Sequence, residues 1–182
     1  MILFDYMTDE NKPIFTKKQI ESDGNEWTYD YFDSVNFNEL PQDRIKQAYG
    51  VCFYGDAMVI GYGGLKKGWG LIGGSLEPGE TYEKALVREI KEESNMEVLS
   101  YLPIGYQRLT NIETGKLIFQ LRYACKVKPL GEFVIDGGDG TTEKGITEIK
   151  LIDPSTYKKY FDWGEIGDYI IKKAVELKSK LD

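Results

Sequence analysis

The chain has 182 residues, with 23 Lys and Arg against 30 Asp and Glu, a formal net charge of −7 and no histidine. The lack of an imidazole excludes a Ser-His-Asp triad, a Cys-His pair, a phosphohistidine and a histidine-bound zinc, so carboxylates must do any acid–base or metal chemistry. An acidic chain also lacks the clustered Lys and Arg surface that binding to duplex nucleic acid requires. Its carboxylates are instead suited to bind a divalent cation, which in turn binds a phosphorylated small molecule.

The composition predicts one well-filled core with a small appendage, because 41% of the residues are apolar and 13% are aromatic. Residues 1–45 are polar and aromatic, and we predict that they form an N-terminal extension packed on or beside a main domain of residues 46–182. Within the extension, residues 27–31 alternate large and polar side chains, which is typical of a half-buried strand.

A strand hairpin opens the predicted main domain. Its strands cover residues 48–54 and 57–62, and a turn at Gly55 and Asp56 joins them. A glycine-dense segment over residues 63–79 leads into a helix predicted over 81–94. Thr81 is a good N-cap for this helix, and an acidic first turn complements the helix dipole.

Two further strands are predicted over residues 98–109 and 117–127. In the second, alternate positions form one apolar face, made of Leu117, Phe119, Leu121, Tyr123, Cys125 and Val127. A loop rich in Gly and Asp, a strand, a short helix and an amphipathic C-terminal helix follow, at residues 136–140, 146–152, from Pro154 and from Gly164. This interleaving predicts an α/β fold, with helices on opposite faces of a mixed central sheet.

Cys52 and Cys125 each lie in an apolar, strand-like run, and we expect both to be buried thiols in a reducing environment. The chain has no run of 18 consecutive apolar residues, and its first residues show no basic segment before an apolar stretch. The expectation is therefore a cytoplasmic protein without a membrane partner.

The helix predicted over 81–94 carries three carboxylates near its end. Glu89, Glu92 and Glu93 stand at i, i+3 and i+4, so their side chains share one face. Like charges this close either raise one another's pKa or share a cation, and oxygen ligands of this density suit Mg²⁺ or Mn²⁺. The alternative is a solvated face neutralised by the cations of the same helix, Lys84, Arg88 and Lys91. The glycine-rich loop that runs straight into the helix favours the metal site.

Residues 74–96 resemble the Nudix box, G-x5-E-x7-R-E-U-x-E-E-x-G-U, in which U is a bulky apolar residue. Eight of the nine defined positions are filled, by Gly74, Glu80, Arg88, Glu89, Ile90, Glu92, Glu93 and Met96. Asn95 replaces the box glycine, and because Asn is the commonest non-glycine residue in a left-handed helix end, we expect the fold to be kept. Residues 69–74 are similar to the Trp-x-x-Pro-Gly-Gly sequence that precedes the box, with Ile72 in place of the proline.

The resemblance implies a Nudix-like α/β/α sandwich and the hydrolysis of a phosphoanhydride bond in a nucleoside diphosphate linked to another moiety, assisted by Mg²⁺ or Mn²⁺. It implies Glu92 and Glu93 as metal ligands, with a loop carbonyl near Gly73 or Gly74 completing the shell. Glu89 is either a third ligand or the group that accepts a proton from the attacking water. The catalytic residues that the resemblance implies are Glu80, Arg88, Glu89 and Glu93, with Arg88 holding Glu89 in place and Glu80 supporting the network.

The residues that bind substrate are less well marked. Many family members contribute a further carboxylate from a late loop or strand. Glu143 and Glu148 are candidates for this role, and the alternative for each is an ordinary surface residue. Arg108 and Arg122 are candidates for holding phosphate or stacking on a base. The positions that distinguish ADP-ribose and dinucleoside polyphosphate hydrolases match neither subfamily, since they are Asn111, Ile112 and Glu113.

Two functions follow from the resemblance. One is a metal-dependent pyrophosphohydrolase acting on a nucleotide-type small molecule, and the other is a Nudix-like module that binds a nucleotide without cleaving it. Degenerate modules usually lose box carboxylates, whereas this chain keeps Glu80, Glu89, Glu92 and Glu93, which favours the enzyme. The N-terminal extension either pairs with a second subunit in a homodimer or simply extends the sheet.

Overall fold

The computed structural model describes residues 12–21, 23–63, 67–133 and 145–181 of the chain. Its strands are β1 (Phe15–Ile20), β2 (Glu26–Asp33), β3 (Ile45–Tyr54), β4 (Ala57–Gly63), β5 (Gly68–Gly70), β6 (Ile72–Ser75), β7 (Met96–Asn111), β8 (Leu117–Pro129) and β9 (Ile146–Ile152). Its helices are α1 (Tyr82–Ser94), α2 (Glu165–Leu177) and three short 3-10 helices at Gln42–Arg44, Pro154–Lys159 and Lys178–Lys180. Within these described ranges, no helix is long and apolar enough to span a membrane.

The described strands form one mixed sheet. Their order is β1-β2-β7-β8-β3-β4-β5, with β6 pairing with β3 and β9 pairing with β4. β3 and β8 run parallel, with Tyr49 opposite Arg122, and the other pairs are antiparallel. Because parallel neighbours require a long crossover, the chain between β3 and β8 has room for α1, which packs across the sheet.

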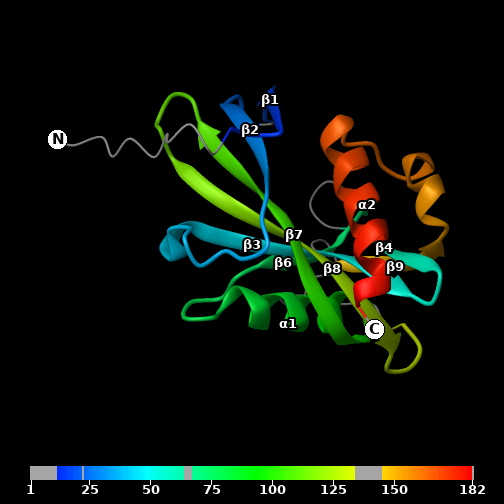
Figure 1. Ribbon diagram of the computed structural model, residues 1–182. Helices are drawn as coiled ribbons and strands as arrows, with labels where there is room; N and C mark the ends of the chain where they lie inside the picture. Colours follow the sequence, from blue (N-terminus) through cyan, green and yellow to red (C-terminus); the bar gives the residue numbers. More distant parts are fainter. Residues whose placement is uncertain (1–11, 22, 64–66, 134–144, 182) are drawn as a thin grey trace.

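The two α-helices cover opposite faces of the sheet (Figure 1). Leu86 and Ile90 of α1 are fully buried in a core shared with alternate side chains of β8 between Phe119 and Val127. Ile170 and Ala174 of α2 are fully buried in a second core on the other face. The α/β/α sandwich with a mixed central sheet predicted from the sequence is confirmed.

Most predicted elements are present, with bounds that shift by a few residues. The glycine-dense segment over 63–79 contains two strands that the pattern did not reveal, β5 and β6. Since the sequence of β6 is Ile-Gly-Gly-Ser, its strand propensity is low, and the hydrogen bonds to β3 make it a strand. The predicted C-terminal helix ends as an α-helix at Leu177 and continues only as a short 3-10 turn.

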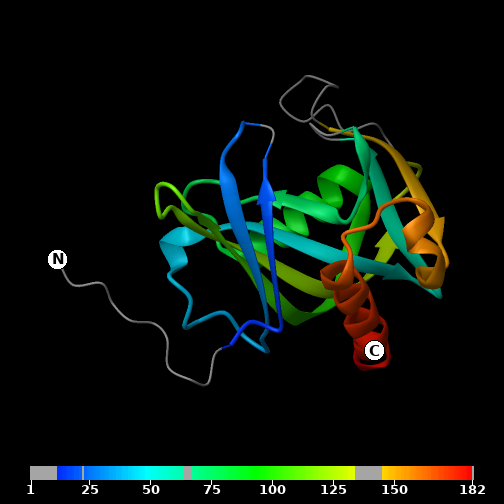
Figure 2. The same cartoon turned by 90° about the horizontal axis from the view of Figure 1, so that it is seen from above.

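In the predicted N-terminal extension, β1 (Phe15–Ile20) pairs with β2 (Glu26–Asp33) as a hairpin, and β2 joins the main sheet by pairing with β7. Phe15 and Tyr31 pack edge-on against Tyr169 of α2, with ring centroids 5.3 and 5.7 Å away. The Tyr169 hydroxyl also donates a hydrogen bond to Asp33 at 2.8 Å. Figure 1 and Figure 2 both show the hairpin next to α2. The hairpin therefore extends the central sheet.

Candidate active site

The box carboxylates Glu89, Glu92 and Glu93 project from α1, and both ends of this helix are fixed by local capping. At the start, the Thr81 side chain accepts a hydrogen bond from Lys84 N at 3.4 Å. At the end, Asn95 has left-handed backbone angles, φ 50° and ψ 41°, as predicted for the residue that replaces the box glycine. The caps fix which residues are helical, and the buried apolar face fixes the rotation of the helix.

Strand β6 brings two glycines against the carboxylate face of α1. A Cβ atom at Gly74 would lie 2.6 Å from Oε2 of Glu89, so this carboxylate rests directly on the strand backbone. Gly73 has a φ of 139°, and a Cβ there would lie 2.3 Å from the carbonyl oxygen of Ala48, so β3 excludes any side chain. The Gly73 N–H donates to Oε2 of Glu93 at 2.9 Å. Strand and helix thus meet through Glu89 and Glu93.

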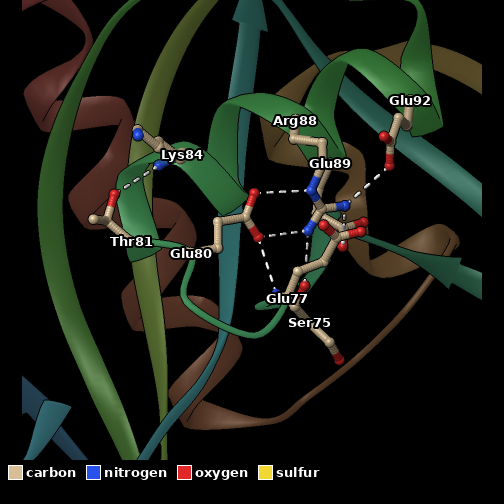
Figure 3. A network of polar contacts seen from close by, with 8 residues as sticks. All are labelled: Ser75, Glu77, Glu80, Thr81, Lys84, Arg88, Glu89 and Glu92. Carbon is tan, nitrogen blue, oxygen red and sulfur yellow. Dashed lines mark hydrogen bonds and ion pairs between the residues drawn. The ribbon is translucent and has the colours of Figure 1, made fainter. Parts of the chain in front are cut away.

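Arg88 is the centre of the polar network shown in Figure 3. Its Nε and Nη2 donate to the two carboxylate oxygens of Glu80, each at 2.9 Å. Its Nη1 donates to Glu89 Oε1 and Glu92 Oε2, both at 3.0 Å, and Nη2 also donates to the carbonyl oxygen of Ser75 at 2.9 Å. The planar fork of a guanidinium can make all these bonds at once, whereas a lysine ammonium cannot.

Two carboxylates of this network have pKa values shifted in opposite directions, for different reasons. The hydrogen bonds from Arg88 lower the pKa of Glu80, and the Glu77 N–H, which donates to Glu80 at 3.0 Å, lowers it further. Burial raises the pKa of Glu89, and the charge of Arg88 offsets only part of this effect. Glu80 is therefore held as an anion, while Glu89 has an increased affinity for a proton.

The oxygen donors at this site suit a hard divalent cation. Glu89, Glu92 and Glu93 offer carboxylate oxygens within little more than one helical turn, beside the main-chain carbonyls of the glycine segment. In the described part of the chain, no three acidic side chains converge on one point, because Glu89 and Glu92 are turned to Arg88 and Glu93 to the Gly73 N–H. The Glu92 side chain is 51% exposed and can turn away from Arg88 at little cost.

The other candidates from the sequence lie in different surroundings. Arg108 on β7 donates two hydrogen bonds to one carboxylate oxygen of Asp30, at 2.8 and 3.2 Å. Glu148 on β9 is exposed and lies 3.7 Å from Lys150. Glu143 falls outside the described residues. The ion pairs of Arg108 with Asp30 and of Glu148 with Lys150 do not involve any residue of the Arg88 network.

Arg122 on β8 is buried, with 4% of its surface exposed, on the face of the sheet that α2 covers in part. Its Nη2 donates to the side-chain oxygens of Gln107 and Gln120. Its guanidinium lies over the ring of Tyr49, 4.9 Å from the centroid. Tyr49 is opposite Gly73 in the β3–β6 pair, so Arg122 is two strands away from the glycines that contact the carboxylates.

A family model of the NUDIX domain matches residues 50–163, which is more than half of the chain and contains the capped helix and the glycine strand. The chain belongs to the Nudix family. The family makes this protein a hydrolase of phosphoanhydride bonds. No curated protein matches this Nudix chain significantly in sequence.

Solved structures show the same fold. The Bacillus subtilis pyrophosphohydrolase BsRppH, in a mutant form, is similar to this Nudix protein with a TM-score of 0.63 and 19% identity, over 91% of this chain and 99% of that chain. A Nudix hydrolase from Nitrosomonas europaea has a TM-score of 0.52 and 16% identity, over 75% and 90% of the two chains. A MutT Nudix hydrolase from Burkholderia pseudomallei has a TM-score of 0.51 and 14% identity, over 70% and 95%. At these identities the likeness concerns the fold.

Sequence analysis of this Nudix domain missed the main-chain partners of the box. Ser75, Glu77 and Gly73 contribute a carbonyl oxygen or N–H group to the network, and their side chains carry no signal for this role. It also missed the glutamines bound to Arg122. Gln107 and Gln120 stand opposite each other on β7 and β8, and polar residues at alternate positions of two neighbouring strands would have been the signal.

Proposed function

We propose that this Nudix hydrolase is a Mg²⁺-dependent pyrophosphohydrolase that cleaves a phosphoanhydride bond in a nucleoside diphosphate linked to another moiety. The observation that supports it best is the contact between α1 and β6, in which the carboxylates of Glu89 and Glu93 rest on the backbone of two adjacent glycines while Arg88 joins Glu89 to Glu80 and Glu92. One helix thus carries the carboxylate oxygens that can bind a metal ion, a candidate for the general base and the guanidinium of Arg88, which is held in place by its hydrogen bonds.

We assign the metal ligands to Glu92, Glu93 and the carbonyl of Gly74, with Mg²⁺ or Mn²⁺ as the cation, and Glu89 is a third ligand only where it does not act as the general base. When bound, such a cation neutralises charge on the pyrophosphate and lowers the pKa of water. Glu93 is already oriented toward the glycine segment by the Gly73 N–H. Glu92 is the most exposed of the three carboxylates and is the one that must exchange Arg88 for the cation.

We assign the general base to Glu89. Its burial raises its pKa, so it takes up a proton from the attacking water more readily than an exposed glutamate would. Nη1 of Arg88 holds the orientation of its carboxylate, and Glu80 holds Arg88 through two parallel hydrogen bonds. Arg88 and Glu80 are therefore positioning residues in this proposal, and they act on the reaction through Glu89.

The proposed substrate-binding residues differ in how well the structure supports them. Arg122 has the strongest support because it lies two strands from Gly73 and has no carboxylate partner in the described ranges. Arg108 is already paired with Asp30 and Glu148 is exposed, so their roles at the substrate rest on the sequence alone, as does that of Glu143.

The N-terminal segment and the location of the protein complete the proposal. The described part of residues 1–45 extends the sheet, and we keep the homodimer as a hypothesis for light scattering to test. Cys52 and Cys125 are free and buried, as predicted, which supports a reducing, cytoplasmic location.

The decisive test is Mg²⁺-dependent hydrolysis by Glu93→Gln. A panel of nucleoside triphosphates, ADP-ribose, nucleotide sugars, dinucleoside polyphosphates and NADH identifies the best substrate of the wild type. Glu93→Gln keeps the size of the side chain but weakens a metal ligand, so kcat should fall by roughly a hundredfold or more with little change in Tm.

Glu97→Gln is the matched control, since Glu97 is an exposed residue paired with Lys128 at 2.9 Å, just beyond the helix. Equal, Mg²⁺-dependent turnover by wild type and Glu93→Gln would refute the assignment, and a wild type that binds nucleotides without turnover would favour a binding module.

A further inference from the structure

Beyond the box, a row of three glutamines crosses the sheet on the same face as Arg122. Gln107, Gln120 and Gln47 are register neighbours on β7, β8 and β3, and Gln47 is in turn opposite Ser75 of β6. All three glutamines are partly exposed. With neighbouring strands about 4.8 Å apart, the row spans roughly 10 Å and ends beside the glycine segment.

Arg122, two residues along β8 from Gln120, is a buried cation that pairs with no carboxylate among the described residues. In the described residues its only hydrogen-bond partners are side-chain oxygens of Gln107 and Gln120 and the Leu121 carbonyl, at 3.1 Å in the last case. Burial lowers the pKa of Arg122 to about 10, so it still carries its charge at neutral pH. A buried charge that no anion compensates is costly, which is the condition under which a ligand anion or acceptor gains most by binding.

Two buried atoms on this face also lack a hydrogen-bond partner among the described residues, Nε of Arg122 and the hydroxyl of Tyr31. Tyr31 is opposite Gln107 on β2, so both atoms adjoin the glutamine row. Unsatisfied buried polar atoms are rare in native proteins and call for an explanation.

The orientation of the glutamine amides follows from the guanidinium. Because arginine has only donors, Gln107 and Gln120 must present their oxygens to Arg122. Gln120 then directs its amino group at the oxygen of Gln47, at 2.5 Å. In the described part of the chain, the amino groups of Gln107 and Gln47 bind no acceptor, and their oxygens are already used. The hydrogen-bonding groups that the row offers to a ligand are therefore the amino groups of Gln107 and Gln47, which are donors.

The donor row lies close to the proposed catalytic carboxylates. Tyr49, which stacks under Arg122, is opposite Gly73, and the charges of Glu93 and Glu89 both act on the Tyr49 hydroxyl. The row ends at Gln47, which is opposite Ser75, the residue next to the glycine of β6 that contacts Glu89.

We propose that the amino groups of Gln107 and Gln47, oriented through Arg122 and Gln120, are donors for hydrogen-bond acceptors of a nucleotide ligand, and this inference rests on the proposed function. Two groups of a nucleotide have this chemistry. One is a 6-oxopurine base, whose O6 and N7 are adjacent acceptors, and the other is a phosphate. Adenine fits poorly, because its N6 amino group is a donor next to N7.

The test uses the full-length protein, labelled with ¹⁵N and kept free of metal with EDTA, so that no turnover occurs. GMP, IMP, AMP and inorganic phosphate are titrated, and the side-chain amide signals of Gln107 and Gln47 report binding. For a base site, GMP and IMP should shift these signals with similar Kd values, and AMP should bind at least about tenfold more weakly. For a phosphate site, inorganic phosphate should shift the same signals and the three nucleotides should bind alike.

The variant Gln107→Glu sharpens the test, because one oxygen can still accept from Arg122 while the outward donor becomes an acceptor. At a base site it should weaken GMP and IMP by at least about tenfold and leave AMP unchanged or tighter, a reversal that general damage to the fold cannot produce. At a phosphate site it should weaken inorganic phosphate and all three nucleotides equally. Gln47→Glu is the second variant, should Gln107→Glu lower the Tm.

Signals of Gln107 and Gln47 that no probe shifts, or Kd values that both variants leave unchanged, would overturn the proposal. Failure of the proposed function has a different signature, namely the absence of Mg²⁺-dependent hydrolysis by the wild type in the substrate panel. The two failures are separate, because the titrations need neither the metal nor turnover.

Discussion

The substitution Gly74→Ala tests whether close contact between β6 and α1 sets the position of the general-base candidate. Gly74 is in strand β6, and the open space that its missing side chain leaves is filled by the carboxylate of Glu89. A methyl group at this position would meet the two oxygens and the carboxyl carbon of Glu89 at 2.6, 2.8 and 2.7 Å. These are the three nearest heavy atoms that such a methyl group would meet in the described part of the chain.

The size of the effect follows from these distances. Ordinary van der Waals contact begins at 3.4 Å, so the carboxylate must move by about 0.8 Å from its present 2.6 Å. Arg88 opposes this movement, since it holds Glu89 at 3.0 Å. A displacement of about 1 Å at a reacting group costs about a hundredfold in rate, whereas the end of a partly exposed side chain moves for about 1 kcal/mol of stability. We therefore expect kcat to fall by one to two orders of magnitude while Tm falls by only a few degrees.

The assay is steady-state hydrolysis of the best panel substrate at saturating Mg²⁺, with Tm measured in parallel. Gly70→Ala is the matched control, because Gly70 lies in the same glycine-dense segment and its added methyl group would meet, among the described residues, just the Trp163 ring, at an ordinary 3.9 Å. The control should keep both kcat and Tm. If Gly74→Ala turns over like the wild type, the position of Glu89 against the strand does not matter for the reaction, and the reasoning is refuted.

Three further predictions concern the network and the helix end. Arg88→Lys should lower kcat by about tenfold or more and Tm slightly, because an ammonium cannot bind both oxygens of Glu80 and still hold Glu89; unchanged kinetics would contradict this. The pKa of Glu80 is lowered from the usual 4.5 in the folded protein, so its contribution to stability is full above pH 4.5 and is lost as the pH falls through the folded value. Urea unfolding of Glu80→Gln at about pH 6 and about pH 3.5 should therefore show a smaller loss of stability on acidification than the wild type shows, and an equal loss would count against the pairing. Asn95→Ala should be less stable than Asn95→Gly by about 1 kcal/mol, because alanine resists the φ of 50°, and equal urea midpoints would contradict the left-handed cap.

Local sequence determined helix α1 almost completely. Thr81 and Asn95 cap it as predicted, and the spacing of Leu86 and Ile90 places its apolar side on the sheet. Alternation along β8 likewise identified the face that packs against α1. These features depend on side chains that are near one another along the chain, so a period of 3.6 or 2 residues is enough to reveal them.

The sequence alone did not decide which strands the N-terminal residues would join. The alternation over residues 27–31 predicted a strand, but either a partner subunit or the edge of the same sheet could have paired with it. The aromatic contacts of Phe15 and Tyr31 with Tyr169 of α2 favour the edge beside β7, and Tyr169 is far from both along the chain.

Only the tertiary structure decided what surrounds the polar side chains. The box motif named Gly74 and Glu89 without showing that one rests on the other, and Arg122 gave no sign of whether it is a surface cation or a buried one. Burial of Arg122 and the direction of its glutamine partners arise where β7, β8 and β3 lie next to one another, between residues that are distant in sequence. Side-chain type and periodicity set which face of a strand a residue occupies, whereas the cost of burying a charge, and the partners that meet it, depend on neighbouring strands that only folding supplies.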